Sequence, residues 1–406
     1  MNTPKIRFKG YTDDWEQRKL GDILERRTEH RQQSEEYPRL AFASGQGVIP
    51  LSERKTNNRE QLTKDEFTKN YLVTELDDIV YNPANLKYGA IDRNKCGRGL
   101  ISPIYVTFTT TEIPGFIERI VTSHAFKQRA LRFEEGTVTK RQSVNPENLV
   151  NLDVLVAPQK EEQTNISALF DNLDNLIALY QRKCDRLNAV KKYMLQKMFP
   201  QNGAKVPEIR FKGFTGAWEQ RKLSDEFSNF IVPMRDKPKE FGGNIPWTRI
   251  EDIEGKYLNG TLSDQYVTKE TVKKMNLKII PKDSLIVSSS ATFGIVAVVT
   301  HDLITNQTFI GLVPNEKDTL DYWYAYFLSD EVRKYMRLQS AGSTIFYIAR
   351  ESFENMPIFI PSKKEMISIG KYFDNLDNLI ALHQRKHDEL KEVKKYMLQN
   401  MFPNKQ

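Results

Sequence analysis

Polar and basic side chains that can bind nucleic-acid bases and phosphates gather in the loops of two long segments, residues 24–157 and 227–360. Arg pairs with the edge of guanine and Asn or Gln with that of adenine, whereas Lys, Ser and Thr contact phosphates or either base. The candidates in the first segment are Arg54, Lys55, Asn57, Asn58, Arg59, Lys87, Tyr88, Arg93, Lys95, Arg98, Lys140, Arg141 and Gln142. Those in the second segment are Lys273, Lys274, Ser288, Ser289, Ser290, Thr292, Asn306, Gln307, Ser343, Thr344, Tyr347 and Arg350. Ordinary solvated loops contain the same residue types, so this interpretation depends on the arrangement of the loops and not on any single residue.

The sequence contains no recognisable catalytic motif. A GxxxxGK[ST] loop, an HExxH or GxSxG motif and a Cys/His zinc cluster are all absent. Residues 43–47 are rich in Gly but lack the following helix of a cofactor loop, and residues 81–84 lack half of the Asn-Pro-Pro-aromatic motif of amino-methyltransferases. Asp77 and Asp78 are adjacent, so in a strand they point to opposite faces and cannot converge on Mg²⁺ as a nuclease requires. We therefore predict a chain that is not an enzyme and has no catalytic residues.

Two histidines four residues apart, His383 and His387, could bind a metal on one face of a helix. Their counterparts in the internal repeat described below are Tyr180 and Cys184, so the second copy has no such pair. We interpret all four as core-filling residues, and Cys184 as a small buried hydrophobe. The prediction is therefore that this chain binds no metal.

The sequence blocks that flank these loop-bearing segments occur twice in the chain as an internal repeat. Residues 6–23 and 209–226 match at 13 of 18 positions, and residues 170–200 and 373–403 match at 25 of 31. Both pairs are separated by 203 residues, half of the chain length of 406. The segments between the matching blocks have diverged, although each contains a buried strand followed by a polar loop and an aromatic-Gly turn. This pattern indicates one scaffold that presents two different surfaces.

The second shared block predicts a long helix, from about residue 160 to 198 in the first copy. Apolar residues recur three and four positions apart over more than four heptads, which is typical of a coiled coil. The seam that we assign consists of Phe170, Leu173, Ile177 and Leu187 in the first copy and Phe373, Leu376, Ile380 and Leu390 in the second. We expect the two helices to pair antiparallel within the chain, although packing on separate domains or against another chain would satisfy the same pattern. The predicted fold class is α+β, with two mixed globular domains separated by two long antiparallel coiled-coil helices in pseudo-two-fold symmetry.

Composition narrows the class of protein further. Hydrophobic residues make up 39% of the chain, as in folded proteins, and two cysteines are too few for a disulfide framework. No apolar run is long enough to span a membrane, so we expect a cytoplasmic protein. The net charge of +7 is compatible with a nucleic-acid partner.

With these features, the sequence closely resembles the specificity subunit of type I restriction–modification systems. The resemblance rests on the paired Trp-Glu-Gln-Arg-Lys-Leu stretches (residues 15–20 and 218–223), the paired helices and the alternation of variable and shared segments. It implies an N-terminal shared block (1–23) that packs with the C-terminal helix region, a first target recognition domain (24–157) and a central shared region with its spacer helix (158–226). A second target recognition domain (227–360) and a C-terminal shared region with the second helix (361–406) complete the chain.

The resemblance also implies partners and a role. Each recognition domain would read one half of an asymmetric bipartite site in double-stranded DNA, and the helices would set the gap and dock two methyltransferase (modification) subunits and, through them, restriction subunits. S-adenosylmethionine, ATP and Mg²⁺ would bind to those partners and not to this chain. Two alternatives remain at this point: a fused DNA methyltransferase and a tandem protein-interaction adaptor.

Overall fold

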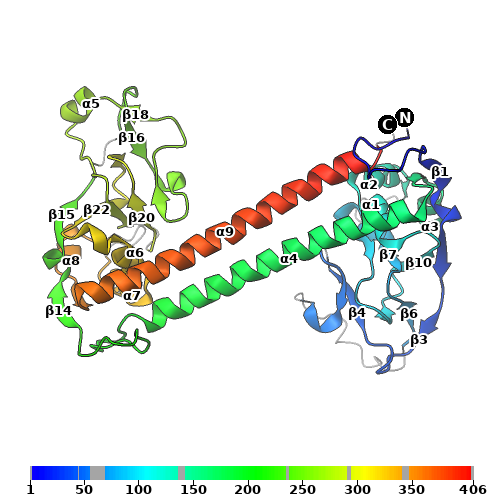
Figure 1. Ribbon diagram of the computed structural model, residues 1–406, viewed down its shortest axis with the longest axis horizontal. Helices are drawn as coiled ribbons and strands as arrows, with labels where there is room; N and C mark the ends of the chain where they lie inside the picture. Colours follow the sequence, from blue (N-terminus) through cyan, green and yellow to red (C-terminus); the bar gives the residue numbers. More distant parts are fainter. Residues whose placement is uncertain are drawn as a thin grey trace. The chain divides into compact units, whose positions relative to one another are not determined.

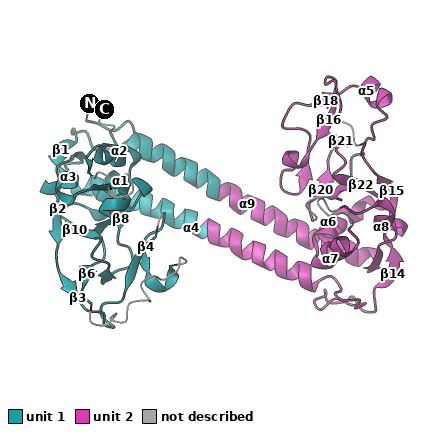
Figure 2. Ribbon diagram, turned by 180° about the vertical axis from the view of Figure 1, so that it is seen from behind, with its two compact units in different colours: residues 1–179, 387–406 teal, residues 180–386 magenta. Residues whose placement is uncertain are grey.

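The computed structural model describes residues 2–43, 45–54, 69–135, 142–234, 237–289, 294–340 and 347–403. The chain divides into two compact units (Figure 2): unit 1 contains residues 1–179 and 387–406, and unit 2 contains residues 180–386. The boundary falls within two long helices labelled in Figure 1, α4 (Lys160–Lys197) and α9 (Lys363–Met401). Each helix therefore contributes one part to each unit, as the two colours of Figure 2 show. The predicted long helix from residue 160 to 198 is thereby confirmed.

Unit 1 combines short antiparallel sheets with three short helices. Its strands are β1 (Glu16–Lys19), β2 (Leu24–Arg27), β3 (His30–Arg31), β4 (Leu40–Ala43), β5 (Gly47–Pro50), β6 (Tyr71–Thr74), β7 (Ile79–Tyr81), β8 (Ile91–Arg93), β9 (Gly99–Ile101), β10 (Val106–Thr110), β11 (Glu134–Glu135), β12 (Ser143–Val144) and β13 (Asp153–Val156). Its short helices are α1 (Pro114–Val121), α2 (His124–Leu131) and α3 (Pro146–Val150), and a 3-10 helix η4 (Pro83–Tyr88) follows β7.

Unit 2 has the same kinds of element in a similar chain order. Its strands are β14 (Glu219–Lys222), β15 (Phe227–Ile231), β16 (Ile245–Thr248), β17 (Tyr257–Leu258), β18 (Tyr266–Val267), β19 (Ser284–Ser288), β20 (Val296–Val299), β21 (Ile304–Thr305), β22 (Phe309–Pro314) and β23 (Pro357–Ile360). Its shorter helices are α5 (Lys269–Lys274), α6 (Leu320–Leu328), α7 (Asp330–Leu338) and α8 (Arg350–Glu354).

The central sheets of the two units have the same strand order. In unit 1 the order is β2-β10-β7-β8, and in unit 2 it is β15-β22-β19-β20, extended by β17, which runs parallel to β20. The inner strands β7 and β19 are buried along their whole length, because sheet neighbours flank both of their edges and apolar side chains cover their faces. Gly89 and Gly294 end the following loops with positive φ angles of 81° and 92°, a conformation that favours glycine. Each variable segment therefore forms a central sheet with the same strand order, although the sequences of the two segments have diverged.

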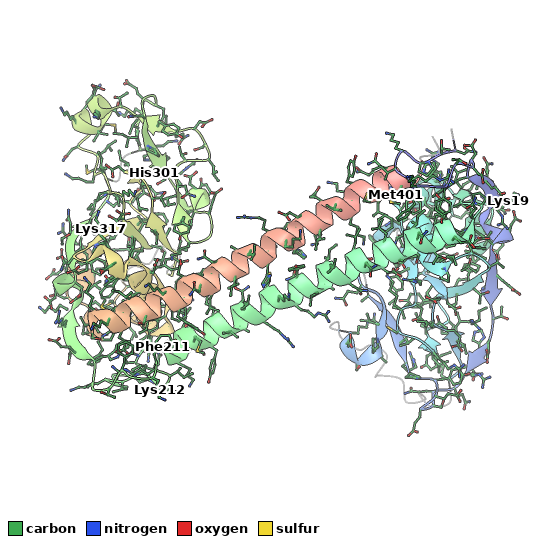
Figure 3. The ribbon with its side chains drawn as sticks, in the orientation of Figure 1. Lys19, Phe211, Lys212, His301, Lys317 and Met401 are labelled. Atoms are coloured by element: carbon green, nitrogen blue, oxygen red, sulfur yellow. The ribbon has the colours of Figure 1, made fainter. Side chains whose placement is uncertain are left out.

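The shared Trp-Glu-Gln-Arg-Lys stretch completes each unit as an added strand. β1 pairs antiparallel with β13, placing Glu16 opposite Val156, and β14 pairs antiparallel with β23, placing Glu219 opposite Ile360. Trp15, at the entry to β1, is buried and packs edge-on against Phe116 of α1 and Phe402, which follows α9. Figure 3 marks Met401, the last residue of α9, directly before this aromatic contact. The shared block therefore joins the variable segment to the end of a long helix.

The parts of α4 and α9 within each unit pack antiparallel. In unit 1 the Phe170 and Phe402 rings lie 6.0 Å apart, and further along the pair Asp174 meets Lys394. In unit 2 the corresponding contacts are Phe199 with Phe373 and Lys191 with Asp377. The predicted antiparallel pairing is confirmed in each unit. No described helix is both long enough and apolar enough to cross a membrane.

The predicted seam residues are all buried or half-buried. Phe170, Leu173, Phe373, Leu376 and Leu390 are buried, whereas Ile177, Leu187 and Ile380 are half-buried. The His383 and Tyr180 rings lie in tilted contact with their centroids 5.6 Å apart, and His387 is buried. Among the described residues no group of three or more His, Cys, Asp or Glu side chains is arranged to hold a metal ion.

Candidate nucleic-acid interface

Several candidate residues cannot be placed. Lys55, Asn57, Asn58, Arg59, Lys140, Arg141, Ser290, Thr292, Ser343 and Thr344 lie outside the described residues. Arg54 and Gln142 border these ranges, and both are half-buried. The structural account of the candidate interface therefore rests on the remaining residues.

The loop after β7 presents a basic residue and an aromatic residue side by side. Asn82 begins η4 by accepting a hydrogen bond from the backbone N–H of Ala84, and Gly89 ends it. Between them, the Tyr88 side chain is 67% exposed, and the Lys87 ammonium lies 5.6 Å from its ring centroid. Lys87 also forms an ion pair with Glu134 at 3.4 Å. A solvent-facing ring beside an ammonium can stack on a base or sugar while the cation contacts a phosphate.

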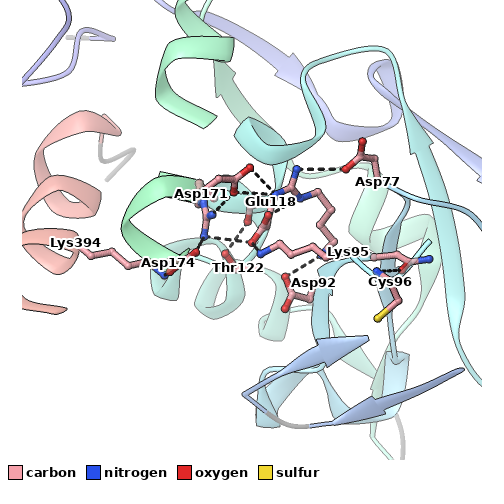
Figure 4. A network of polar contacts seen from close by, with 12 residues as sticks. Asp77, Asp92, Lys95, Cys96, Glu118, Thr122, Asp171, Asp174 and Lys394 are labelled. Carbon is pink, nitrogen blue, oxygen red and sulfur yellow. Dashed lines mark hydrogen bonds and ion pairs between the residues drawn. The ribbon is translucent and has the colours of Figure 1, made fainter. Parts of the chain in front are cut away.

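Arg93 does not lie on an exposed loop, although the sequence predicts it as a DNA-contacting residue. Its guanidinium is only 11% exposed and forms ion pairs with Asp77, Glu118 and Asp171 (Figure 4). Burial alone would lower its pKa, but Glu118 and Asp171 raise it above the ordinary value, so Arg93 stays charged within the protein. The sequence missed this because Glu118 and Asp171 approach Arg93 only through the fold.

Two other cations, in the connection between β8 and β9, remain accessible to solvent. Lys95 reaches Glu118 at 2.7 Å and Arg98 reaches Glu36 and Glu75, yet both side chains stay about half exposed. The Arg98–Glu36 pair is exposed on both sides and contributes little to stability, so Arg98 is able to exchange this partner for a phosphate. The Glu118 carboxylate that pairs with Lys95 is only 3% exposed, so Lys95 has a buried partner although its own side chain is accessible.

In unit 2 the candidates divide between buried and exposed residues. Ser288 and Ser289, predicted as exposed loop residues, are buried at the end of β19, where the Ser289 hydroxyl donates to the carbonyl of Thr308. Lys273 and Lys274 are exposed in the last turn of α5. Asn306 is half-buried and its side chain accepts from the backbone N–H of Thr308.

The remaining described candidates of unit 2 are accessible. Gln307 is exposed beside Asn306. Tyr347 is exposed, and Arg350, at the start of α8, forms an ion pair with Glu354 one turn later. Among the described candidates, unit 2 therefore offers exposed cations, the Gln307 amide and the Tyr347 ring, whereas Ser288 and Ser289 are buried.

The sequence reading missed an aromatic–basic cluster in unit 2. Lys237 lies 5.3 Å from the ring centroid of Trp247 and 5.5 Å from that of Phe241, and Arg249 lies 5.5 Å from Trp247. Phe241 is partly exposed. The spacing of Trp247, in β16, and Arg249, directly after it, was a signal that could have pointed to this cluster, because residues two apart in extended chain share a face.

Exposed apolar residues recur at equivalent positions of the two long helices. In unit 1 they form patch 1, which consists of Leu176, Leu179, Val393 and Tyr396. In unit 2 they form patch 2, which consists of Leu379, Leu382, Val190 and Tyr193. With Phe170 and Phe373 at heptad position a, all eight occupy positions g and c, which border the same side of an antiparallel seam. Each unit therefore displays one apolar patch built from both helices.

The chain matches a family model and curated relatives. Residues 216–392 match the family described as "Type I restriction modification DNA specificity domain". Over 188 residues the chain is 26% identical to the type I restriction enzyme MjaIX specificity subunit of Methanocaldococcus jannaschii, covering 46% of this chain and 44% of the relative. Over 164 residues it is 34% identical to the EcoprrI specificity subunit of Escherichia coli, covering 36% of this chain and 40% of the relative. These matches span less than half the length of either relative, and they confirm the resemblance seen in the sequence.

Solved structures show that the fold is shared as well. A crystal structure of a type I restriction–modification S subunit from M. genitalium has a TM-score of 0.58 and 14% identity, covering 100% of both chains. A chain from a study of complex assembly and conformational transition of the type I restriction–modification system has a TM-score of 0.51 and 16% identity, covering 96% of this chain and 98% of that one. At these identities the similarity concerns the fold alone.

Proposed function

Because this chain carries a type I restriction modification DNA specificity domain and is related to type I specificity subunits, we propose that it selects the DNA sequence on which such a complex acts. Residues 24–157 and 227–360 are the two target recognition domains, and each reads one half of a bipartite site. The observation that carries this proposal is the shared central sheet, β2-β10-β7-β8 and β15-β22-β19-β20, under loops of different sequence. Different loops on one scaffold read different bases, so the site is asymmetric.

The accessible candidates supply the contacts. Lys87, Tyr88, Lys95 and Arg98 serve the first half-site, and Lys273, Lys274, Gln307, Tyr347 and Arg350 serve the second. Arg and Gln provide base-edge contacts, whereas Lys provides phosphate contacts that fix the register of the protein on the duplex. Arg93, Ser288 and Ser289 are excluded from this set because they are buried.

The long helices set the gap between the half-sites. A helix rises about 1.5 Å per residue and DNA about 3.4 Å per base pair, so seven added residues correspond to about three base pairs. An insertion of seven residues in both helices, after Tyr180 in α4 and after His383 in α9, keeps the heptad pattern at the point where these two rings meet. The modified gap is expected to lengthen by about three base pairs, and an unchanged gap would contradict this role.

Patch 1 and patch 2 are the docking sites of two modification subunits. Restriction subunits bind to the complex through these modification subunits. Two patches of nearly the same composition fit two copies of one partner. The chain itself is not catalytic, and S-adenosylmethionine, ATP and Mg²⁺ are bound by the partner subunits. Equilibrium binding of radiolabelled S-adenosylmethionine to the isolated chain would contradict this and favour a fused methyltransferase.

The decisive experiment is a map of methylated adenines in a genome that carries this gene together with its modification subunit. An asymmetric site with two dissimilar halves and one gap length is expected. Exchange of residues 24–157 for the segment of another family member should change one half only. A palindromic site, or no site dependent on this gene, would refute the proposal.

A further inference from the structure

Each long helix contains two aspartates three residues apart in the repeated sequence Phe-Asp-Asn-Leu-Asp. They are Asp171 and Asp174 in α4, and Asp374 and Asp377 in α9, which we call the aspartate pair of unit 1 and of unit 2. Residues three apart on a helix lie on the same side. The two carboxylates of a pair can therefore act on the same neighbouring structure.

The first aspartate of each pair binds a buried cation from the variable segment. In unit 1, Arg93 at the end of β8 donates to both carboxylate oxygens of Asp171 at 2.8 Å (Figure 4). In unit 2, Lys256 lies directly before β17, and its ammonium is 2.5 Å from Asp374 and 2.6 Å from Asp321. Arg93 and Lys256 are not equivalent in the repeat, so two unrelated surfaces meet the same helix position with the same charge.

The second aspartate binds a lysine from the opposite helix. Asp174 accepts from Lys394 of α9, and Asp377 accepts from Lys191 of α4. These lysines interrupt the apolar seam at the same position in both copies. The interruption is thus an ion pair between the helices and not a packing defect.

In each unit, a second side chain of the variable segment lies between the contact of the first aspartate and that of the second. In unit 1 the Arg119 guanidinium contacts Asp171 and Asp174, both at 2.9 Å. In unit 2 the Tyr324 ring lies 5.4 Å from the Lys256 ammonium and 5.6 Å from that of Lys191. The variable segment, α4 and α9 are therefore joined at one point in each unit.

The charges at this point are matched, and the cations at its centre are hidden from solvent, whereas Lys95 and Asp77 at its edge stay about half exposed. The cluster in unit 1 contains Arg93, Lys95, Arg119 and Lys394 against Asp77, Glu118, Asp171 and Asp174. The Arg119 and Lys256 side chains are only 5% exposed. A buried charge is costly without a counter-charge, so these contacts hold in one arrangement and not in a slipped one.

We propose that Arg93 and Lys256 are positioning residues that fix the orientation of each recognition domain on the helix pair through Asp171 and Asp374. A recognition segment that functions on this scaffold must bring a buried cation to the first aspartate. The inference rests on the proposed function, because the consequence is a defined distance between the half-sites. Loss of the cation leaves recognition of the half-site bases intact and weakens the preference of the complex for one gap length.

The test replaces Lys256 by Met in the complex with its modification subunits and measures methylation of DNA sites whose gaps differ by single base pairs. Asp374 and Asp321 are partly exposed, so water can solvate them in the variant and the fold is retained. We expect at least a tenfold rise in methylation of sites with gaps one base pair longer or shorter, relative to the cognate gap. The half-site sequences should not change. Lys256→Arg should restore the wild-type ratio.

The matched control is Lys317→Met, which removes an exposed cation of unit 2 that pairs with Asp283. It should leave the gap preference unchanged. Asp374→Asn provides a second, milder variant if Lys256→Met does not fold, and it should loosen the gap in the same direction. An unchanged gap preference in folded Lys256→Met or Asp374→Asn overturns the inference, whereas a wild-type complex without any gap preference overturns the proposed function itself.

Discussion

The backbone N–H of Ile6 donates a hydrogen bond to the carbonyl of Asn400 at 2.9 Å, which joins the first residues of the chain to the end of α9. The same bond recurs 203 residues along the repeat, from Ile209 to Lys197, at 2.9 Å. In unit 2 the two partners are connected by the chain itself, whereas in unit 1 they are not. The two junctions are therefore equivalent in structure and differ only in covalent continuity.

This equivalence predicts that a circular permutant folds and functions. Direct fusion of Gln406 to Met1 places nine residues between Phe402 and Ile6, the number that separates Phe199 from Ile209. New ends between Gly203 and Ala204 cost the single turn hydrogen bond from Ala204 to Gln201. The permutant should keep the thermal midpoint within a few degrees and methylate the same site. New ends at Asn188, inside α4, serve as the control and should abolish folding, because they interrupt the helix ladder.

Removal of the Asp174 charge should destabilise the protein in a pH-dependent way. Burial alone would raise the pKa of Asp174, but the hydrogen bond from Lys394 and the charge of Arg119 lower it below the ordinary value. A carboxylate with a lowered pKa in the folded state stabilises fully above its unfolded pKa of about 3.9, and this contribution disappears as the pH falls through the folded value.

Asp174→Asn should therefore lower the free energy of unfolding by about 1–3 kcal/mol at pH 7. The difference from wild type should shrink as the pH falls below about 4, because the wild-type carboxylate becomes protonated. Urea unfolding followed by circular dichroism at several pH values measures both quantities. Asp185→Asn, on the exposed side of α4, should change the free energy of unfolding little at any pH. A difference that persists at pH 3 would show that Asp174 acts by packing.

Polar substitutions in patch 1 or patch 2 should remove one modification subunit each. Leu176→Gln with Tyr396→Gln alters patch 1, and Leu379→Gln with Tyr193→Gln alters patch 2; all four side chains are exposed. Surface changes of this kind shift stability by about 0.5 kcal/mol or less, so the free chain should unfold as wild type does. Native mass spectrometry should detect the loss of one partner copy per altered patch. Lys192→Gln, exposed on the same helix, is the control. If a chain with both patches altered still bound two modification subunits, the patches would not be the docking sites.

The exposed cations of α5 should act through phosphates. Lys273→Gln with Lys274→Gln should weaken DNA binding by the complex for all sequences alike, and reduce the salt dependence by about 0.9 in the log–log slope per lost contact. In contrast, Tyr88→Ala should affect only sites that carry the first half-site, because Tyr88 belongs to unit 1. Fluorescence anisotropy at several salt concentrations measures both effects. Lys317→Gln removes one exposed positive charge elsewhere in unit 2 and is the control. An equal loss of slope per removed charge in that variant would reduce the α5 effect to net charge alone.

The repeat, the long helices and their seam were determined by the sequence itself. Heptad spacing from Phe170 to Met198 and its second copy are local patterns, and the residues that create them lie next to one another on one helix. The family resemblance followed from the same blocks. The loops were also recognised as polar surfaces, since Lys87 and Tyr88 lie between a buried strand and a glycine turn.

Only the tertiary structure decided which polar residues face solvent. Arg93 and Ser288 look like loop residues in the sequence, but Arg93 is held by Asp171, 78 positions away, and Ser288 ends a strand that neighbours cover. The seam lysines Lys191 and Lys394 read as interruptions until Asp377 and Asp174 were found opposite them. The physical reason is that burial and ion pairing depend on residues brought together from distant parts of the chain, whereas helical periodicity depends on neighbours a few positions away.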